Sequence, residues 1–388
     1  MKVYPKPFCG LLSFNVVGSP FPRIILYSSL ITCLSGVLEA SDFQLVTSSR
    51  TLNGSTGFIH PYPFQIWAFL VGFGLIFRTN LAYGRYWDAR LSLSVVSSKW
   101  SDAALQFKSF LRKVPKTEGG GEGGSEDDHA KRLRELNESF IHGISLLHAL
   151  SIMALRGDDV TSSGKSSNIV TDYPSVSLPS YQSSFPPFPS PPLDSSTTLP
   201  RTSRLVLIFF PRFTPLHNAY VASLNPLPVL YPLKPSDLKV FNLSPTTPGL
   251  PASVQTMRLH NIAVAALQEG DLDIPPPVFT RLLQVLSEGT LGFQRALSIA
   301  DTPFPFPYAQ AITVMVWSFC LSVPFIISAF VEGVVLACVG TFLTVTSYLA
   351  LNQVAREIEE PFGADPNHLP LAWMQWAFNR RISVAAEL

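Results

Sequence analysis

Charged residues are scarce in this sequence. Only 14% of the 388 residues are Asp, Glu, Lys or Arg, whereas about a quarter are charged in an ordinary soluble domain. Because 28 basic residues nearly balance 27 acidic ones, the formal net charge is +1, which excludes a global field that would recruit nucleic acid. Together with a hydrophobic content of 47%, this shortage of charge predicts that lipid forms part of the solvent around the protein.

Cysteine and histidine are also few, and neither forms a pattern typical of a metal or catalytic site. The seven histidines are scattered, and His142 and His148 are not spaced as two ligands on one helical face would be. HExxH, GxGxxG, GxSxG and phosphate-loop patterns are absent. The four cysteines, predicted to be small buried hydrophobes rather than disulfides or zinc ligands, are Cys9, Cys33, Cys320 and Cys338. The sequence therefore gives no indication of an enzyme, and it implies no cofactor.

Long uncharged runs are what the sequence does contain. Residues 308–331 and 333–352 are separated only by Glu332, which predicts a tight hairpin of two membrane spans. Two further spans are expected at about residues 22–40, which is short, and 61–83. Residues 8–17 are apolar too, but no small-x-small cleavage site follows them, so no signal peptide is expected. The predicted fold class is an all-α membrane protein with four transmembrane helices.

The distribution of charge predicts the orientation in the membrane. Between residues 78 and 113, directly after the second span, seven basic residues stand against Asp88 and Asp102. Because basic residues are enriched on the cytoplasmic side, this segment and both termini are expected in the cytoplasm of a multi-pass protein. A plasma membrane and an organelle membrane both satisfy this pattern.

The same features divide the chain into segments. Residues 1–113 form the N-terminal membrane half and continue into a cytoplasmic helix, and 308–371 form the C-terminal membrane half. Residues 254–307 are expected as cytoplasmic helices, and 372–388 as a tail. Residues 114–253 form a cytoplasmic region whose Gly-rich and Ser/Pro-rich inserts, 117–128 and 158–204, are expected to be disordered.

One aromatic pattern in the second span is compatible with a pore. Phe69, Phe73 and Phe77 recur every fourth residue, so they lie along one face of a helix. Such a stripe is typical of helix packing or of a lipid-facing surface, but three rings in line can also narrow a passage. The spacing alone leaves these interpretations open.

The residues that follow this stripe carry a resemblance. The segment RTNLAYGRYWDAR, residues 78–90, resembles the signature after the second transmembrane helix of the bestrophin family of anion channels, including its fungal, plant and bacterial branch. The resemblance implies a ring-shaped homo-oligomer, a pentamer in that family, in which Phe69, Phe73 and Phe77 form the hydrophobic neck of a chloride channel. The residues it places in the motif and at the inner mouth are Arg78, Asn80, Arg85, Trp87, Asp88 and Arg90. A plainer interpretation of Arg85 is a membrane-interface anchor paired with Asp88 on one helix.

A second segment with this resemblance ends the last span. AREIEEPFGADPNHLPL, residues 355–371, resembles the stretch in which animal members hold calcium. Asp365 matches an acidic ligand position, but His368 stands where a second acidic ligand is expected, so Asp365 is a weak calcium candidate. The alternative is a helix stop, because Pro361 disfavours helix at Glu360. The residues expected at this cytoplasmic end are Glu357, Glu360, Pro361, Phe362, Gly363 and Asp365.

The expected function is passive conduction of chloride and other small anions across a lipid bilayer. Two alternatives remain. A secondary anion transporter would require broken spans around a midplane site, and Pro324 is the one such break that the sequence offers. A non-conducting membrane scaffold would carry no flux.

Overall fold

The protein is helical in every long segment that the structure describes. The computed structural model describes residues 21–41, 62–112, 123–157, 227–231, 233–241, 249–331, 333–363 and 367–387. An isolated bridge between extended segments joins Leu111 and Leu272. The helices are α1 Phe21–Ala40, α2 Tyr62–Phe110, α3 Gly123–Arg156, α8 Pro235–Phe241, α9 Leu250–Gln268, α10 Pro276–Asp301, α11 Phe306–Phe330, α12 Val334–Ile358 and α13 Leu371–Glu387. The predicted all-α fold class is confirmed.

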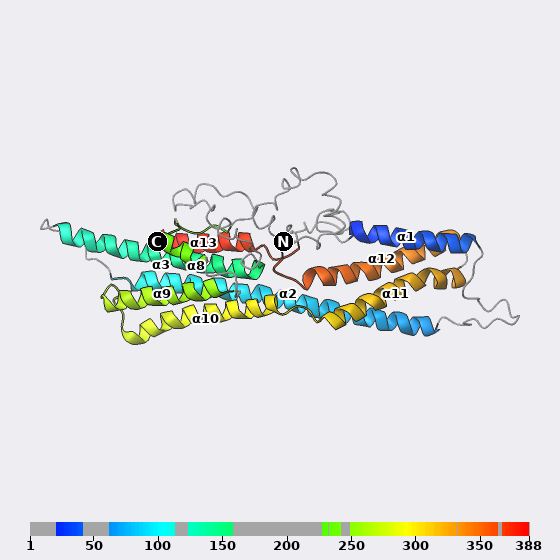
Figure 1. Cartoon of the computed structure of the whole chain (residues 1–388), viewed down its shortest axis with the longest axis horizontal. Coiled ribbons are helices and arrows are strands. Elements are labelled where there is room, and N and C mark those ends of the chain that lie inside the picture. Colours follow the sequence, from blue (N-terminus) through cyan, green and yellow to red (C-terminus); the bar gives the residue numbers. More distant parts are fainter. Residues whose placement is uncertain are drawn as a thin grey trace, which may run out of the picture.

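Helix α2 organises the molecule along its long axis (Figure 1). It has 49 residues, about 74 Å at the rise of an α-helix. Its N-terminal part lies with α1, α11 and α12, and its C-terminal part lies with α3, α9 and α10 (Figure 1). The second span therefore continues without a break into the following helix.

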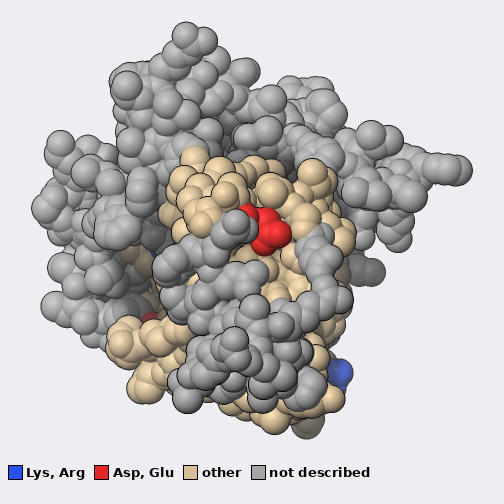
Figure 2. All heavy atoms as spheres, turned by 90° about the vertical axis from the view of Figure 1, so that its right-hand side faces the viewer, with Lys and Arg blue, Asp and Glu red and all other residues tan. Residues whose placement is uncertain are grey.

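The end of the molecule that holds α1, α11 and α12 has the composition of a membrane segment. Helix α11 contains no charged residue, and α12 contains none before Arg356. Figure 2 shows this end, and the described atoms that face the viewer are almost all uncharged. The core that joins the four helices here consists of Ile24, Ile31, Val71, Leu75, Ile312, Val316, Phe319, Cys320, Val323, Val345 and Leu349. The protein is an integral, multi-pass membrane protein.

Helix α3 satisfies the length and hydropathy expected of a span, but its surroundings assign it a different role. Of its most apolar window, 89% is buried inside the chain, against 22% for α2 and for α12. It shares a hydrophobic core with α9, α10, α13 and the second half of α2. A helix that is apolar all round and covered by its own protein is a core helix. Among the described helices the spans are thus α1, α2, α11 and α12, although α1 is the shortest of the four.

Three helical segments differ from the sequence-based expectation. Helix α3 begins at Gly123, so the end of the insert predicted to be disordered over 117–128 is helical. Residues 372–388, expected as a tail, lie almost entirely in α13, which buries Met374, Phe378 and Ile382 in the core. Helix α11 runs through Pro324 without interruption, so this proline does not divide the span. The insert 158–204 lies outside the described residues.

The cysteines are distributed differently from the prediction. Cys320 is buried and Cys338 is partly buried, but Cys33 is exposed on α1. The exposed position of Cys33 shows that one face of α1 is uncovered in a single chain. In a membrane span, lipid can cover an apolar residue that the protein core does not cover, so an apolar run does not by itself predict burial in the core. Cys9 lies outside the described residues.

Candidate functional site

The predicted aromatic stripe lies on the uncovered face of α2. The exposed fractions of Phe69, Phe73 and Phe77 are 75%, 61% and 50%. The rings of Phe69 and Phe73 stack with centroids 6.4 Å apart and an interplanar angle of 20°. The opposite face of the same helix buries Val71 and Leu75 in the core with α11 and α12. The stripe is therefore free to face either lipid or a passage shared with other copies.

Two tyrosines hold the backbone of α2 behind the stripe. The hydroxyl of Tyr348 donates to the carbonyl oxygen of Ala68 at 3.3 Å, and that of Tyr308 donates to the carbonyl oxygen of Gly74 at 3.4 Å. Gly74 also allows a close helix contact, because a Cβ there would lie 2.7 Å from a methyl group of Ile312. Helices α11 and α12 thus fix the part of α2 that presents the phenylalanines.

Arg78 is buried and paired within its own chain. Its guanidinium donates to Glu359 Oε2 at 2.9 Å, to Asn352 Oδ1 at 3.0 Å and to Thr313 Oγ1 at 3.3 Å. It also lies 5.7 Å from the ring centroid of Phe304. The guanidinium that the sequence analysis places at the inner mouth is therefore paired with a carboxylate of its own chain.

Arg85 binds backbone carbonyls rather than Asp88. Its guanidinium donates to the carbonyl oxygens of Ile299 at 3.0 Å, Thr302 at 2.9 Å and Glu359 at 3.2 Å. These carbonyls lie at the C-terminal ends of α10 and α12, where helices leave acceptors without intrahelical partners and where a cation is favoured. Arg85 therefore joins two helix ends to α2, a role that neither interpretation of the sequence included.

The remaining residues of the motif lie on or near the surface. Asn80 and Asp88 are exposed, and Arg90 is partly buried. Trp87 is about half exposed and stacks on Tyr83, with ring centroids 6.1 Å apart. The motif thus divides into two arginines that hold helices together and a set of residues that a neighbouring molecule or solvent can reach.

The segment after α12 forms a tight turn. Pro361 and Phe362 are buried, and the Pro361 carbonyl accepts a hydrogen bond from the Leu369 amide at 2.9 Å. A Cβ at Gly363 would lie 2.2 Å from Nδ1 of the buried His368, so only glycine fits there without a shift. These contacts are those of a helix stop docked on its neighbours.

The described acidic side chains of this turn do not fit a calcium ion. Both carboxylate oxygens of Glu357 accept hydrogen bonds, from the Gln353 and Asn367 amides, and Glu359 pairs with Arg78. Calcium needs six to eight oxygen ligands, and no group of three or more potential metal ligands occurs within the described ranges. Asp365 lies outside them, and Glu360 is exposed.

Glu359 is the site residue that the sequence did not single out. It lies in a run of acidic residues, EIEE, in which nothing marks one member as buried. The one available signal was Arg78 itself, which directly follows an uncharged span and requires a partner if it is buried.

Known membrane proteins are similar to this chain in sequence and in fold. Residues 254–384 match the family described as Bacterial/Fungal Bestrophin protein. The chain is 37% identical over 76 residues to the voltage-dependent anion channel-forming protein YneE of Salmonella typhimurium, and 36% identical over 114 residues to such a protein, RSc3414, of Ralstonia nicotianae. These alignments span only 23% and 34% of the length of the two relatives.

Solved structures extend the similarity to nearly the whole fold. A point variant of a bacterial bestrophin homologue from Klebsiella pneumoniae superposes with a TM-score of 0.60 at 14% identity, covering 95% of this chain and 100% of that one. Another crystal structure of such a homologue from the same organism gives a TM-score of 0.58 at 14% identity, over 94% of this chain and 97% of that one. The predicted resemblance to the bestrophin family is thus confirmed: the C-terminal third of the chain matches the bacterial and fungal family in sequence, and nearly the whole chain is similar in fold to bacterial bestrophin homologues.

Proposed function

We propose that identical copies of this chain assemble as a ring, of five by the family resemblance, and conduct chloride and related small anions passively through a central passage lined by α2. The observation that carries the proposal is the exposed stripe of Phe69, Phe73 and Phe77 on a helix whose opposite face is covered by its own chain. The names of the relatives, voltage-dependent anion channel-forming proteins, support an anion as the permeating species.

A contrast between two spans favours a passage over lipid as the neighbour of this stripe. The large exposed side chains of α12 are all aliphatic, whereas those of α2 at the same end of the molecule include the three phenylalanines. Aliphatic side chains suffice for contact with acyl chains. The column of aromatic rings on α2, spaced every fourth residue, is explained if this face has a different neighbour, namely the same rings of other copies around an axis.

Phenyl rings supply the chemistry that a hydrophobic neck requires. They offer no hydrogen bond to a hydrated ion, so a narrow ring of them can empty of water and close the passage. When the passage widens, the positive edges of the rings can face an anion. Weakly hydrated anions such as iodide, thiocyanate and nitrate lose less on shedding water, and we expect them to permeate more readily than chloride.

Only some residues of the motif 78–90 are available at the inner mouth of the proposed passage. With Arg78 and Arg85 engaged inside the chain, the motif residues left to meet an anion beyond Phe77 are Asn80, which is exposed, and Arg90, which is partly buried. An amide N–H and a guanidinium at the end of an apolar constriction raise the local concentration of anions.

The proposed topology follows from charge. The seven basic residues of segment 78–113 place it in the cytoplasm by the positive-inside rule. Residues 1–113 and 308–371 then contribute the membrane halves, and 114–253, 254–307 and 372–388 lie on the cytoplasmic side with both termini.

Flux through liposomes that contain the purified protein tests the proposal. A channel passes anions at rates far above carrier turnover, a carrier saturates with anion concentration, and a scaffold gives no flux. The carrier alternative has lost its one sequence feature, because α11 is continuous through Pro324.

A further inference from the structure

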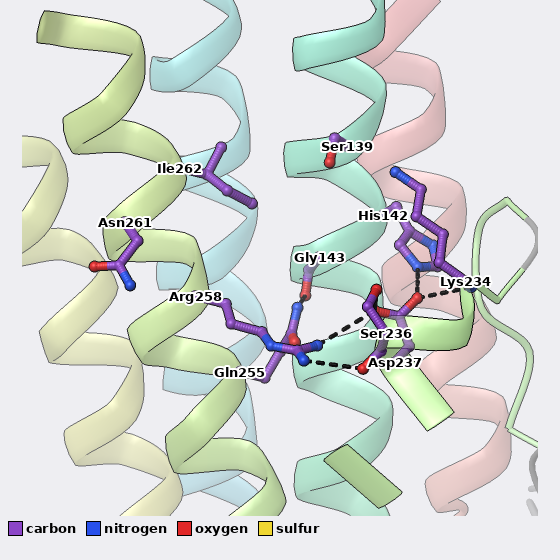
Figure 3. Close-up of a pocket in the computed structure, with 10 residues that line it drawn as sticks. All are labelled: Ser139, His142, Gly143, Lys234, Ser236, Asp237, Gln255, Arg258, Asn261 and Ile262. Atoms are coloured by element: carbon purple, nitrogen blue, oxygen red, sulfur yellow. Dashed lines mark hydrogen bonds and ion pairs between the residues drawn. The ribbon is translucent and has the colours of Figure 1, made fainter. Parts of the chain in front are cut away.

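A polar cavity between α3 and α9, far from the aromatic stripe, has the features of a ligand site. Its volume is about 380 Å³, room for roughly a dozen water molecules at ~30 Å³ each. Figure 3 shows its walls: His142 comes from α3, Gln255 and Arg258 come from α9, Lys234 directly precedes α8, and Asp237 lies in the first turn of α8. Its lining is therefore mostly polar and drawn from three separate parts of the chain.

One wall of the cavity holds a buried histidine between two hydrogen-bond acceptors. His142 Nδ1 lies 2.6 Å from the carbonyl oxygen of Leu230, and Nε2 lies 3.0 Å from Asp237 Oδ2. A carbonyl and a carboxylate only accept hydrogen bonds, so both ring nitrogens of His142 face acceptors. Burial raises the pKa of Asp237, but hydrogen bonds from His142 and from the Lys234 amide outweigh it and hold that pKa below its ordinary value. Asp237 is thus an anion that His142 and the Lys234 amide already hold by hydrogen bonds.

The basic side chains of the cavity, Lys234 and Arg258, exceed its single carboxylate. Arg258 donates to Asp237 Oδ1 at 3.4 Å and to the Ser236 carbonyl oxygen at 2.9 Å, so it shares the carboxylate that His142 already holds. The Lys234 side chain is exposed and extends toward α3 beside His142 (Figure 3). The lining thus contains one carboxylate, Asp237, and the two cations Lys234 and Arg258, which leaves a surplus of positive charge that suits an anion.

The cavity lining also contains a buried hydrogen-bond acceptor that has no partner. Gln255 is 3% exposed and lines the cavity, and its Nε2 donates to the Gly143 carbonyl oxygen at 3.1 Å. Its Oε1 is buried and has no hydrogen-bond partner. An unsatisfied buried acceptor is costly, and such exceptions are expected where a ligand or water completes the set. The missing partner is an N–H or O–H group.

We propose that this cavity binds a small anion that also carries a hydrogen-bond donor, the chemistry shared by protonated phosphate, phosphate monoesters and hydroxycarboxylates. Lys234 and Arg258 pair with the anionic group, and the donor of the ligand satisfies Gln255 Oε1. The site joins α3, α9 and the start of α8, so an occupant stabilises the contact between them. The inference does not depend on the proposed pore.

Binding of inorganic phosphate, sulfate and lactate to the purified full-length protein, measured by calorimetry at pH 7 and fixed chloride, tests the site. Phosphate and sulfate are similar in size and charge, but only phosphate keeps a proton at this pH. We expect phosphate to bind several-fold more tightly than sulfate, and lactate to compete with phosphate if the site accepts carboxylates. Equal affinity for phosphate and sulfate would overturn the role of Gln255, and no binding of any of the three would overturn the site.

A charge variant locates the binding. Lys234→Gln removes a cation whose side chain makes no hydrogen bond or ion pair among the described contacts, and should weaken phosphate binding about fivefold. The matched control is Lys131→Gln, an exposed lysine on α3 outside the cavity. Phosphate binding that is equal in both variants places the anion elsewhere, in a pore for example, and contradicts the proposal. Liposome flux in Lys234→Gln reports on the pore separately, so the two proposals fail independently.

Discussion

Arg78 Nη2 lies 2.9 Å from Glu359 Oε2, and both side chains are buried. The pair joins α2, directly below the aromatic stripe, to the end of α12 and the turn that follows it. Asn352 and Thr313 add neutral acceptors from α12 and α11. One guanidinium therefore ties together three of the four spans at the level where the uncharged end of the molecule meets its polar half.

The first prediction concerns this ion pair. Arg78→Ala leaves Glu359 buried without its cation, and removing one partner of a buried pair typically costs about 3–5 kcal/mol. We expect a large drop in the apparent melting temperature of the purified protein, together with loss of flux because the stripe is no longer held in register. Thermal unfolding followed by intrinsic fluorescence measures the first effect.

The matched control exchanges both partners. The double variant Arg78→Met, Glu359→Met replaces the pair by apolar side chains of similar length, which is often tolerated where a single deletion is not. It should recover most of the lost stability. If the double variant is as unstable as Arg78→Ala, then the pair itself is not what the single substitution disrupts.

The sequence was sufficient for the spans but not for the contacts between them. Uncharged runs locate α11 and α12 because nearly every residue of a span must be uncharged to lie in lipid, whatever its neighbours in the fold are. The partner of Arg78 lies 281 positions away in the chain, and EIEE offers several equivalent carboxylates. Such pairing depends on which helices pack together, and neither periodicity nor charge counting contains that information.

The region beyond the spans illustrates the same limit. The periodicity of α3 correctly predicts a helix ending at Gly157, which adopts a φ of +71° and is the kind of residue that closes a helix. The high hydropathy of α3 does not reveal whether lipid or protein covers it. Only the packing of α9 and α13 around it decides this.

The second prediction tests the neck. Phe73→Ala removes the central ring of the stripe and widens the constriction, so dewetting is weaker and the closed passage leaks. We expect higher basal anion flux in liposomes and a less strongly gated conductance in bilayer recordings. A current-voltage relation identical to that of the unaltered protein would remove the neck assignment.

Leu343→Ala is the control for this substitution. Leu343 on α12 is 60% exposed, nearly the same as Phe73 at 61%, and lies among aliphatic residues that we expect to face lipid. Its truncation should leave the conductance unchanged. An equal rise in leak for both variants would indicate a general loosening of the spans rather than a neck at Phe73.

The third prediction is a pH dependence of stability. Burial lowers the pKa of His148 from 6.5 to about 4, opposed by the hydrogen bond to Gln375 and reinforced by Arg381. Because the folded state holds this ring neutral while the unfolded state protonates it, stability is full above about pH 6.5 and falls as the pH drops toward 4. A shift of this size corresponds to about 3 kcal/mol.

The contribution of His148 can be separated from that of other groups. In His148→Gln this titrating group is absent, so the decline in melting temperature between pH 6.5 and 4 should be shallower, although the variant is less stable at neutral pH because the stacking on Phe378 is lost. His260→Gln, a partly buried histidine on α9, should retain the slope of the unaltered protein. Equal slopes in all three proteins would show that His148 is not the responsible group.

The fourth prediction concerns the packing of α10 on α2, the most extensive helix contact of the structure. At Gly289 a Cβ would lie 2.3 Å from Nε1 of Trp100, a fully buried ring that donates to the Leu286 carbonyl oxygen at 3.3 Å. Gly289→Ala must therefore displace this ring or separate the helices, at a cost of about 1–3 kcal/mol.

Gly340→Ala on α12 is the matched control, because a Cβ there meets only a methyl group of Ile327 at 3.6 Å and the gain in helix propensity is about 1 kcal/mol. We expect the first substitution to lower the melting temperature and the second to leave it unchanged or raise it. If both act alike, the close approach of α10 to α2 at Gly289 is not what holds this half of the molecule together.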